Sequence, residues 1–218
     1  MTLSSPLLPK VQKGAIAAYA FPSPLPKIII FQYNPDGVGR QLASRGAPGG
    51  GGRGDAQRVN GPPSETISLS VKIDASDQLQ FPDQNGLTVD NGLHPVIAAI
   101  EGLMYPSYAA VLANQAMALA GSAFILGEQA PLAFLIWGAR RVEPVQLATA
   151  NIREEAFDAK LNPIRVTADL SLRLLTYRDL DVTNPGYWVH LASFTQKEVM
   201  SALNLSQPAS GTAPQGPL

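Results

Sequence analysis

The sequence predicts a mainly β or α+β protein with antiparallel strands, and three observations lead to this prediction. Apolar residues occupy every second position of 164–174, which is the period of a strand with one dry face and one exposed face. The same alternation runs through 65–74. Helical patterns are confined to one segment between strands and to the C-terminal part, so the chain does not repeat the βαβ unit of a parallel sheet.

The first third of the chain contains three predicted strands and a glycine-rich segment. Residues 14–20 (GAIAAYA) and 27–33 (KIIIFQY) are rich in apolar side chains and are expected to be strands. The NPDG sequence at 34–37 supplies a turn. Residues 41–63 contain GAPGGGGRGD and few apolar side chains, so we expect a flexible loop before the strand at 65–74.

Three segments have helical patterns. Residues 94–104 begin with His-Pro, and either Asn91 or His94 is expected to cap this helix. The alanine-rich segment 108–126 is long enough to approach a membrane span. Because polar residues interrupt it and alanine gains little on entering lipid, a buried helix that packs closely against a partner is favoured. A short helix is expected at 195–203.

The strongest strand pattern lies in the C-terminal half. Residues 132–138 (LAFLIWG) form a continuous apolar strand, and 140–157 continue as strands interrupted by Pro144. The Asn-Pro pair at 162–163 has turn chemistry, so 154–177 is predicted to be a hairpin. At about 3.3 Å per residue its second strand extends about 40 Å, which suits a barrel wall or an assembly surface better than a compact enzyme core.

The composition limits the classes of partner. The chain has 218 residues, of which 45% are hydrophobic and 15% are charged, and its formal net charge is −1. It lacks the clustered lysines and arginines that bind phosphate backbones, so no nucleic-acid partner is expected. Low charge favours a surface that other subunits cover. The chain has no cysteine, which excludes disulfides and thiolate metal sites, and prolines near the N-terminus interrupt any signal-peptide core.

The motifs reveal no catalytic, cofactor or metal site. The GGGGRGD sequence lacks the Gly-Lys-Ser/Thr of a phosphate-binding loop. The two histidines lie far apart in the sequence, so surface or capping roles are favoured over a metal site with a nearby aspartate. Glu154 and Glu155 face opposite sides of a strand and cannot act together on one substrate, so salt bridges to Arg153 or Arg165 are favoured. We therefore predict a non-enzymatic protein.

Several segments follow one another in an order that carries a family resemblance. They are FQYNPDGVGR at 31–40, VKIDASDQL at 71–79, GLHPVIAAIEGLMYP at 92–106 and LAFLIWG at 132–138, followed by the predicted hairpin. This order resembles the tube-type domain of contractile injection systems, which are phage-tail-like particles whose baseplate adaptors share one domain with the inner tube. The resemblance covers the chain from about Lys27 to Asp181.

Ten residues match the motifs of that family. In the family, a strand ending in Phe-x-x-Asn-Pro opens the domain, a later strand carries an apolar-Trp-Gly motif, and a Glu-Glu-x-Phe-Asp segment precedes a Pro-x-Arg turn into the last long strand. The matching residues here are Asn34, Pro35, Trp137, Gly138, Glu154, Glu155, Phe157, Asp158, Pro163 and Arg165. The family's adaptors often carry a C-terminal LysM module, and none is recognisable after Asp181, so LysM-mediated contacts are not expected.

The resemblance implies a fold, an assembly and a function. The expected fold is an antiparallel tube-type β-barrel with a helical insertion and a short C-terminal helix. The expected assembly is a homo-oligomeric, hexameric ring, in which the polar positions of the last strand face a channel or a neighbouring ring. The expected function is a structural baseplate component that adapts the spike hub to the inner tube. Expected partners are the spike or hub protein, inner tube proteins and other baseplate subunits, with no membrane partner and no cofactor.

The same resemblance suggests a division of the chain and leaves alternatives open. The predicted parts are an N-terminal strand and proline-rich arm (1–26), a barrel domain (27–181) with a flexible loop (41–63) and a helical insertion (94–126), a helical extension (182–206) and a disordered tail (207–218). The particle is expected to assemble in the cytoplasm, and its later release stays open. The alternatives are the inner tube subunit or tube initiator itself and a small-molecule-binding β-barrel protein.

Overall fold

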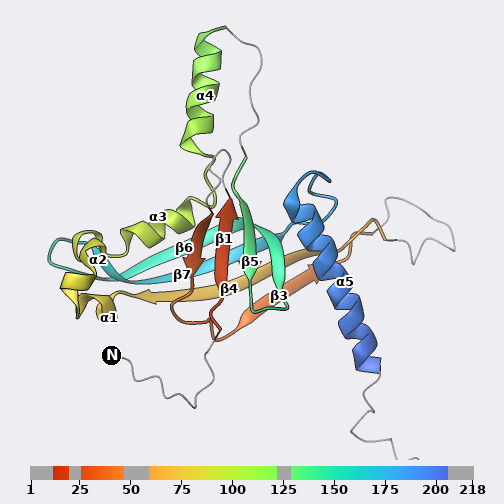
Figure 1. The fold of residues 1–218 in the computed structure, drawn as a ribbon, viewed down its shortest axis with the longest axis horizontal. Coiled ribbons are helices and arrows are strands. Elements are labelled where there is room, and N and C mark those ends of the chain that lie inside the picture. Colours follow the sequence, from red (N-terminus) through yellow and green to blue (C-terminus); the bar gives the residue numbers. More distant parts are fainter. Residues whose placement is uncertain (1–11, 20–25, 47–58, 122–128, 206–218) are drawn as a thin grey trace, which may run out of the picture.

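The computed structural model describes residues 12–19, 26–46, 59–121 and 129–205, and these form an α+β protein (Figure 1). The strands are β1 (Ala15–Tyr19), β2 (Lys27–Ile30), β3 (Val38–Ala43), β4 (Ser64–Asp74), β5 (Leu132–Ile136), β6 (Val142–Phe157) and β7 (Pro163–Leu174). The helices are α1 (Ser76–Leu79), the 3-10 helix η2 (Pro82–Gln84), α2 (Gly86–Asn91), α3 (His94–Glu101), α4 (Tyr108–Leu119) and α5 (Pro185–Leu205).

The strands form one antiparallel sheet that is open at both edges. Its seven strands follow the order β2-β1-β5-β6-β7-β4-β3, and every neighbouring pair is antiparallel. Within the described residues, the edge strands β2 and β3 do not pair with each other. The predicted antiparallel strands are confirmed, but closure of this single chain into a barrel is not.

Strand β6 connects two halves of the sheet that lie across each other. Residues 142–145 pair with β5, whereas 145–157 pair with β7, and the register shifts between Leu147 and Thr149. Such a bulge bends a strand and increases its twist. In Figure 1, β1 and β5 accordingly cross steeply over β4, β6 and β7.

The hydrophobic core lies between these two halves. One cluster of buried side chains joins Ile16 and Leu135 from the first half to Ile67, Val71 and Leu172 from the second. Helix α3 covers one end of the cluster through its own buried isoleucines. The bent sheet thus encloses its own core, and the opposite face of β4, β6 and β7 stays outside.

The predicted alternation of β4 and β7 is confirmed by the burial of their side chains. In β4, the buried apolar residues are Ile67, Leu69, Val71 and Ile73. In β7, every second side chain from Val166 to Leu174 is buried, and the residues between them are exposed or half-buried. The two strands pair residue by residue, so their apolar sides lie on the same face.

Several predicted boundaries are wrong. Residues 41–43 belong to β3 and not to a loop, and Gly46 pairs with Val59, while 47–58 lie outside the described residues. Pro144 does not interrupt a strand: β6 runs through it, and its carbonyl oxygen accepts the N–H of Leu175 at 2.9 Å. Proline is tolerated there because the position needs only an acceptor.

The helices differ from the sequence-based expectations in length and number. Helix α5 spans Pro185–Leu205, well beyond the predicted 195–203, and the helices at 76–91 were not predicted. Neither Asn91 nor His94 caps α3, because Leu93 occupies the N-cap position without a side-chain hydrogen bond. The N-terminal strand, predicted to be part of a separate arm, lies within the sheet between β2 and β5.

Helix α4 contradicts the prediction of a buried alanine-rich helix. It spans Tyr108–Leu119, contains no buried residue and projects away from the sheet in Figure 1. Residues 122–126 of the predicted helix, like the tail at 207–218, lie outside the described residues. Across the part of the chain that the structure describes, no helix is both long and apolar enough to cross a membrane.

Candidate functional site

Asn34 connects the turn after β2 to the start of β1. Its Oδ1 accepts the backbone N–H of Gly14 at 2.9 Å, and its Nδ2 donates to the carbonyl oxygen of Gln12 at 2.8 Å. Pro35 follows in the turn before β3 and is half-buried. The Asn-Pro motif therefore fixes two neighbouring strand ends and carries no chemistry of its own.

Trp137 and Gly138 directly follow β5, and they lie close to the same start of β1 that Asn34 contacts. The Trp137 ring lies 6.3 Å from the Phe31 ring, and a Cβ on Gly14 would lie 2.8 Å from both side chains. Gly138 has a φ of +74°, which suits the tight turn into β6. Two motif groups that are distant in the sequence thus pack together around Gly14.

The remaining motif residues surround the β6–β7 hairpin. Asp158 accepts the N–H groups of Lys160 at 2.7 Å and Asn162 at 2.8 Å through Oδ1, and the Asn162 side chain through Oδ2 at 2.9 Å. The hydrogen bonds from Asn162 are the largest of the effects that lower the pKa of this carboxyl below its usual range. Leu161 has a φ of +66°, so the corner is built by Asp158 together with a left-handed residue.

The predicted salt bridges of the glutamates are not formed. Arg165 instead pairs with Asp74 across the sheet, with Nε 2.9 Å from Oδ2. Glu155 accepts the hydroxyl of Thr167 at 3.0 Å. Glu154 is exposed and has no hydrogen bond or ion pair within the described residues. Phe157 is 48% exposed, whereas Pro163 opposite it is buried.

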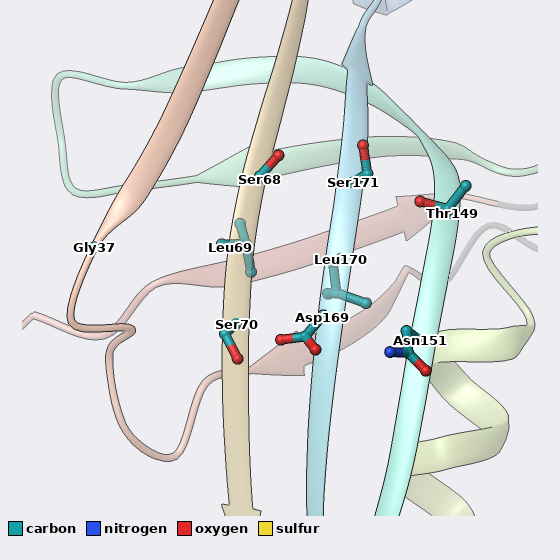
Figure 2. Close-up of a pocket in the computed structure, with 9 residues that line it drawn as sticks. All are labelled: Gly37, Ser68, Leu69, Ser70, Thr149, Asn151, Asp169, Leu170 and Ser171. Carbon is teal, nitrogen blue, oxygen red and sulfur yellow. The ribbon is translucent and has the colours of Figure 1, made fainter.

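Small polar side chains cover the outer face of β4, β7 and β6. Figure 2 shows them side by side, pointing away from the core-facing Leu69 and Leu170. The strand register places them in two rows, which are Ser68–Ser171–Thr149 and Ser70–Asp169–Asn151. They line a shallow hollow of about 400 Å³ that Gly37 borders. We call this surface the polar sheet face.

A second site lies at the end of the sheet that α5 covers, and we call it the buried charge cluster. Its members are Arg40, Glu65, Arg141, Glu143, His190, Ser193 and Lys197. Glu65 and Glu143 are only 3% and 1% exposed. The two carboxylates occupy inward positions of β4 and β6, in the same alternation as the apolar core residues.

The carboxylates of this cluster are held by cations from other elements. Arg40 of β3 donates to Glu65 at 2.5 Å. Lys197 of α5 lies 2.9 Å from Oε1 of Glu143, and the Ser193 hydroxyl donates to the same oxygen at 2.7 Å. Buried charges that are paired and hydrogen-bonded in this way avoid most of their desolvation cost.

The bonding of the cluster is nevertheless incomplete. Three buried atoms have no hydrogen-bond partner within the described residues, and they are Nη2 of Arg141, Oε2 of Glu143 and Nδ1 of His190. Burial, and after it the charge of Arg40, lowers the pKa of the Arg141 guanidinium, although both glutamates oppose this shift. Buried polar atoms without a partner are rare in folded proteins, so each of these three atoms calls for a further partner such as a water molecule or an ion.

Sequence reasoning missed this cluster, although a signal for it was present. Glu65 continues the series of Ile67, Leu69 and Val71 on one side of β4, so the alternation itself places a carboxylate on the buried face. A charged residue in an apolar register requires a buried partner. The partner could not be identified, because Arg40 lies between the predicted turn at 34–37 and the predicted loop at 41–63, where no strand was expected.

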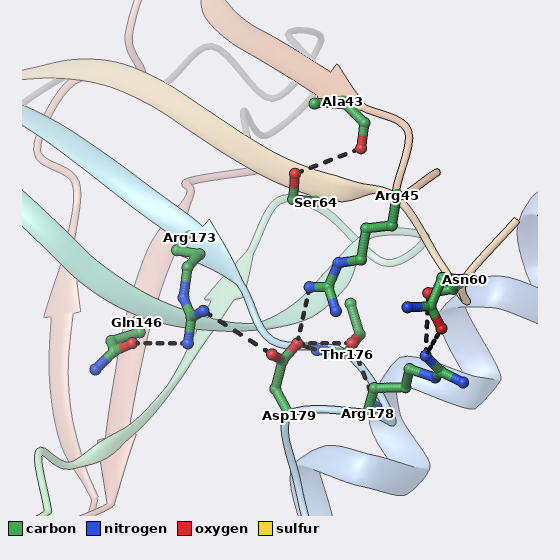
Figure 3. A network of polar contacts seen from close by, with 9 residues as sticks. All are labelled: Ala43, Arg45, Asn60, Ser64, Gln146, Arg173, Thr176, Arg178 and Asp179. Atoms are coloured by element: carbon green, nitrogen blue, oxygen red, sulfur yellow. Dashed lines mark hydrogen bonds and ion pairs between the residues drawn. The ribbon is translucent and has the colours of Figure 1, made fainter. Parts of the chain in front are cut away.

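Asp179 forms a further polar network beside α5 (Figure 3). It accepts the N–H and the hydroxyl of Thr176 at 2.9 and 2.6 Å and lies 3.6 Å from Arg45. Burial works against ionisation of Asp179, but the bonds from Thr176 and the charge of Arg45 outweigh it and lower its pKa. Arg178 donates to Asn60, so the turn before α5 is tied to the segments that flank the β3–β4 connection.

Within the part of the chain that the structure describes, neither site contains the ligands of a metal centre. Among the described residues, no group of three or more histidine, cysteine, aspartate or glutamate side chains is placed to hold a metal ion. In comparisons with known proteins, the chain matches no family model and no curated protein. The proposed function therefore rests on the structure of this chain itself.

Proposed function

We propose that this protein is a non-enzymatic ring subunit of a contractile injection system, which adapts the spike hub to the inner tube in the baseplate. The observation that carries the proposal is the polar sheet face. Long strands turn a continuous apolar side to the core, and small polar side chains occupy the middle of their outer side, with the charged Lys72, Arg165 and Arg173 beyond them. A subunit that lines a channel is expected to have such an apolar side facing its core and such a polar side facing the channel.

The side chains of the polar sheet face suit a passage for cargo. The two rows consist of serine, threonine and asparagine with a single charged residue, Asp169. Short hydroxyl and amide groups keep the wall wet and narrow it little, and a low charge density avoids binding passing cargo of either sign. In the proposed ring, this face lines the lumen.

The two open edges support an assembly through continued sheets. On edge strand β2, Ile28 and Ile30 are 58% and 62% exposed, and on edge strand β3, Leu42 is 53% exposed. An exposed edge with apolar side chains is a template for pairing with another chain. In the proposed ring, β2 of one subunit meets β3 of the next, and the closed barrel wall arises between chains.

Helix α5 has its apolar side on the outside, which supports contacts with further baseplate proteins. Its polar residues Ser193 and Lys197 face the buried charge cluster. Trp188, Phe194 and Val199 are 59%, 47% and 50% exposed. A helix with this inverted arrangement exposes a hydrophobic patch, and such patches mark interaction surfaces. We assign it to contact with the hub or the tube.

The ring is tested by measuring the mass of the purified chain by light scattering and imaging it by negative-stain microscopy. The wild-type chain is expected to form closed rings of uniform size. Ile28→Lys with Ile30→Lys places charges on the β2 edge and should yield folded monomers. Leu87→Lys, in the 79% exposed position on α2, is the matched control and should assemble normally. A wild-type chain that stays monomeric at high concentration, or an edge variant that assembles equally well, would falsify the ring.

The adaptor role is separated from the tube alternatives by copy number. We expect one ring of this chain per purified particle, and particles without tubes when the chain is deleted. A copy number equal to that of the main tube protein would instead favour the inner tube subunit. The small-molecule-binding alternative gains no support from the hollow on the polar sheet face, which is shallow and open and is lined by serine, threonine and asparagine side chains with Asp169.

A further inference from the structure

A hollow of about 270 Å³ opens beside the buried charge cluster, between the β5–β6 turn and α5. It is lined by Arg40, Arg140, Arg141, Glu143, Ser193, Gln196, Lys197 and Met200. The volume corresponds to several water molecules, since each occupies about 30 Å³ of liquid. The hollow is therefore large enough for a small polar ion and too small for most drug-sized ligands.

The charges around this hollow do not cancel. Its lining contains four cations and one carboxylate, and Glu65 beneath it adds a second carboxylate. The carboxylates are already used, because Arg40 pairs with Glu65 and Lys197 pairs with Glu143. Arg140 and Arg141 are left over, and neither side chain has a hydrogen bond or ion pair within the described residues.

The backbone presents these two arginines at one place. They end the short turn between β5 and β6, which begins at Gly138 with its positive φ and closes where the N–H of Trp137 donates to the carbonyl oxygen of Arg141 at 2.8 Å. The charge of Arg40 acts unfavourably on Arg141, although Glu65 and Glu143 act in the opposite direction. The Nη2 of Arg141 is buried without a hydrogen-bond partner in the described part of the chain, so it has an unused donor for a bound acceptor.

We propose that this hollow is a binding site for a small oxyanion, a phosphate or carboxylate group, held by the guanidinium groups of Arg140 and Arg141. Arginine matches both groups geometrically, because its planar fork donates two parallel N–H bonds to a pair of oxygens. Lys197 borders the site and adds positive charge, and Glu143 weakens it. The site goes beyond the proposed ring function, since it uses neither the polar sheet face nor the exposed apolar side chains of the two edges, although Arg40 in its lining belongs to edge strand β3.

The proposal is tested by isothermal titration of the full chain with inorganic phosphate and, separately, with succinate. Ionic strength is matched with sodium chloride, because salt screens exposed charges. We expect saturable binding of one ion per chain for at least one of the two probes. Arg141→Gln and Arg140→Gln should each weaken it at least tenfold. Arg153→Gln, an exposed arginine on the face of β6 away from the cluster, is the matched control and should leave affinity unchanged.

The outcomes separate the proposal from its alternatives. Tighter binding of phosphate assigns the site to phosphate groups, and tighter binding of succinate assigns it to carboxylates. Glu143→Gln should tighten binding, an effect that a purely structural arginine pair would not produce. The proposal is overturned if neither probe saturates, if chloride competes as well as the probes, or if Arg140→Gln binds normally. Arg140 is exposed, so this last variant remains informative even where Arg141→Gln does not fold.

Discussion

Gly92 shows how one backbone conformation joins two distant parts of the chain. Its φ of +56° is unfavourable for other residues, and a Cβ there would lie 2.5 Å from the carbonyl oxygen of Pro163. The same oxygen accepts the N–H of Leu93 at 2.8 Å. The junction of α2 and α3 is thereby fastened to the start of β7.

Gly92→Ala is therefore expected to destabilise the protein by roughly 2–4 kcal/mol, from backbone strain plus displacement of the hairpin. Gly86→Ala is the matched control, because a Cβ at Gly86 meets open space at the beginning of α2. That variant should be unchanged or slightly more stable. Urea unfolding of the two variants gives the comparison, and equal losses would show that the junction is not tied to β7.

A pair of adjacent residues in β7 tests the two faces of the sheet. Leu170 is 3% exposed and faces the core, whereas Ser171 lies on the polar sheet face. Leu170→Asp buries an unpaired carboxylate and should cost roughly 3 kcal/mol or more. Ser171→Asp should cost about 1 kcal/mol or less, and at most disturb ring assembly. Thermal unfolding measures both, and similar losses would mean that β7 is buried on both faces.

His190 is expected to make the stability of the fold depend on pH. It is 4% exposed, and its ring lies 5.7 Å from that of Tyr177. Burial lowers the pKa of the imidazole, with Glu143, Asp179 and Glu65 opposing this shift and Lys197 adding to it. The folded state therefore binds fewer protons than the unfolded state, so this contribution to stability is complete above about pH 6.5 and is lost as the pH falls below it.

The wild-type chain is consequently expected to lose more thermal stability between pH 7.5 and 5.5 than the His190→Gln variant. Differential scanning fluorimetry at several pH values measures the two slopes. The aspartates with lowered pKa titrate below this window and affect both proteins alike. Parallel slopes would show that His190 is not the group responsible.

At the scale of elements, α4 shows that a helix of hydrophobic composition is not necessarily buried in this fold. It contains no charged residue and no buried residue, and Leu119 is 90% exposed. Leu119→Lys is expected to change the free energy of unfolding by no more than about 0.5 kcal/mol. Ile100→Lys in α3, at a position 1% exposed, is the matched comparison and should unfold the protein or nearly so. Guanidinium denaturation checks both. A large loss in the α4 variant would indicate that the helix packs on its own chain.

The elements that could be predicted are those whose pattern has one explanation. The alternation in β4 and β7 fits only a strand with one dry face, and the Asn-Pro pair at 162–163 between two strand patterns favours a corner, so this hairpin is found where expected. The alanine-rich segment is compatible with a buried helix, an interface helix or a membrane segment, and the buried helix that its composition favours is not what the structure shows. Local pattern does not choose among them, because the choice depends on what lies next to the helix.

For the same reason, the polar sheet face could be predicted from the sequence and the buried charge cluster could not. The polar sheet face follows from the alternation of β7, which already placed Thr167, Asp169 and Ser171 on one side. The buried charge cluster joins β3, β4, β6 and α5, whose contributing residues lie far apart in the sequence. Only the fold brings Arg40, Glu65 and Lys197 together, so no spacing in the sequence encodes the cluster.

At the scale of the whole molecule, the open sheet and its exposed edges have a consequence for assembly. A subunit with two different edges can join the next copy head to tail, β2 against β3, and such a contact closes into a ring when the rotation between copies is an integral fraction of a turn. The same contact without closure gives an open filament. The proposed ring therefore requires β2 and β3 of neighbouring copies to meet, and it requires the last copy to join the first.

Engineered cysteines on the two edges test this directly, because the native chain has no cysteine to form competing disulfides. Ile30→Cys on β2 combined with Leu42→Cys on β3 places one thiol on each edge at exposed positions. A disulfide forms only when the Cα atoms come within about 4.4–6.8 Å, so Ile28→Cys with Leu42→Cys covers the other register.

On mild oxidation, denaturing electrophoresis should show a ladder that stops at the number of subunits in the ring, with a circular top band that reduction removes. Each single variant is the control and should give dimers at most. A ladder without an upper limit would indicate a filament, and dimers alone from both double variants would show that the two edges do not meet.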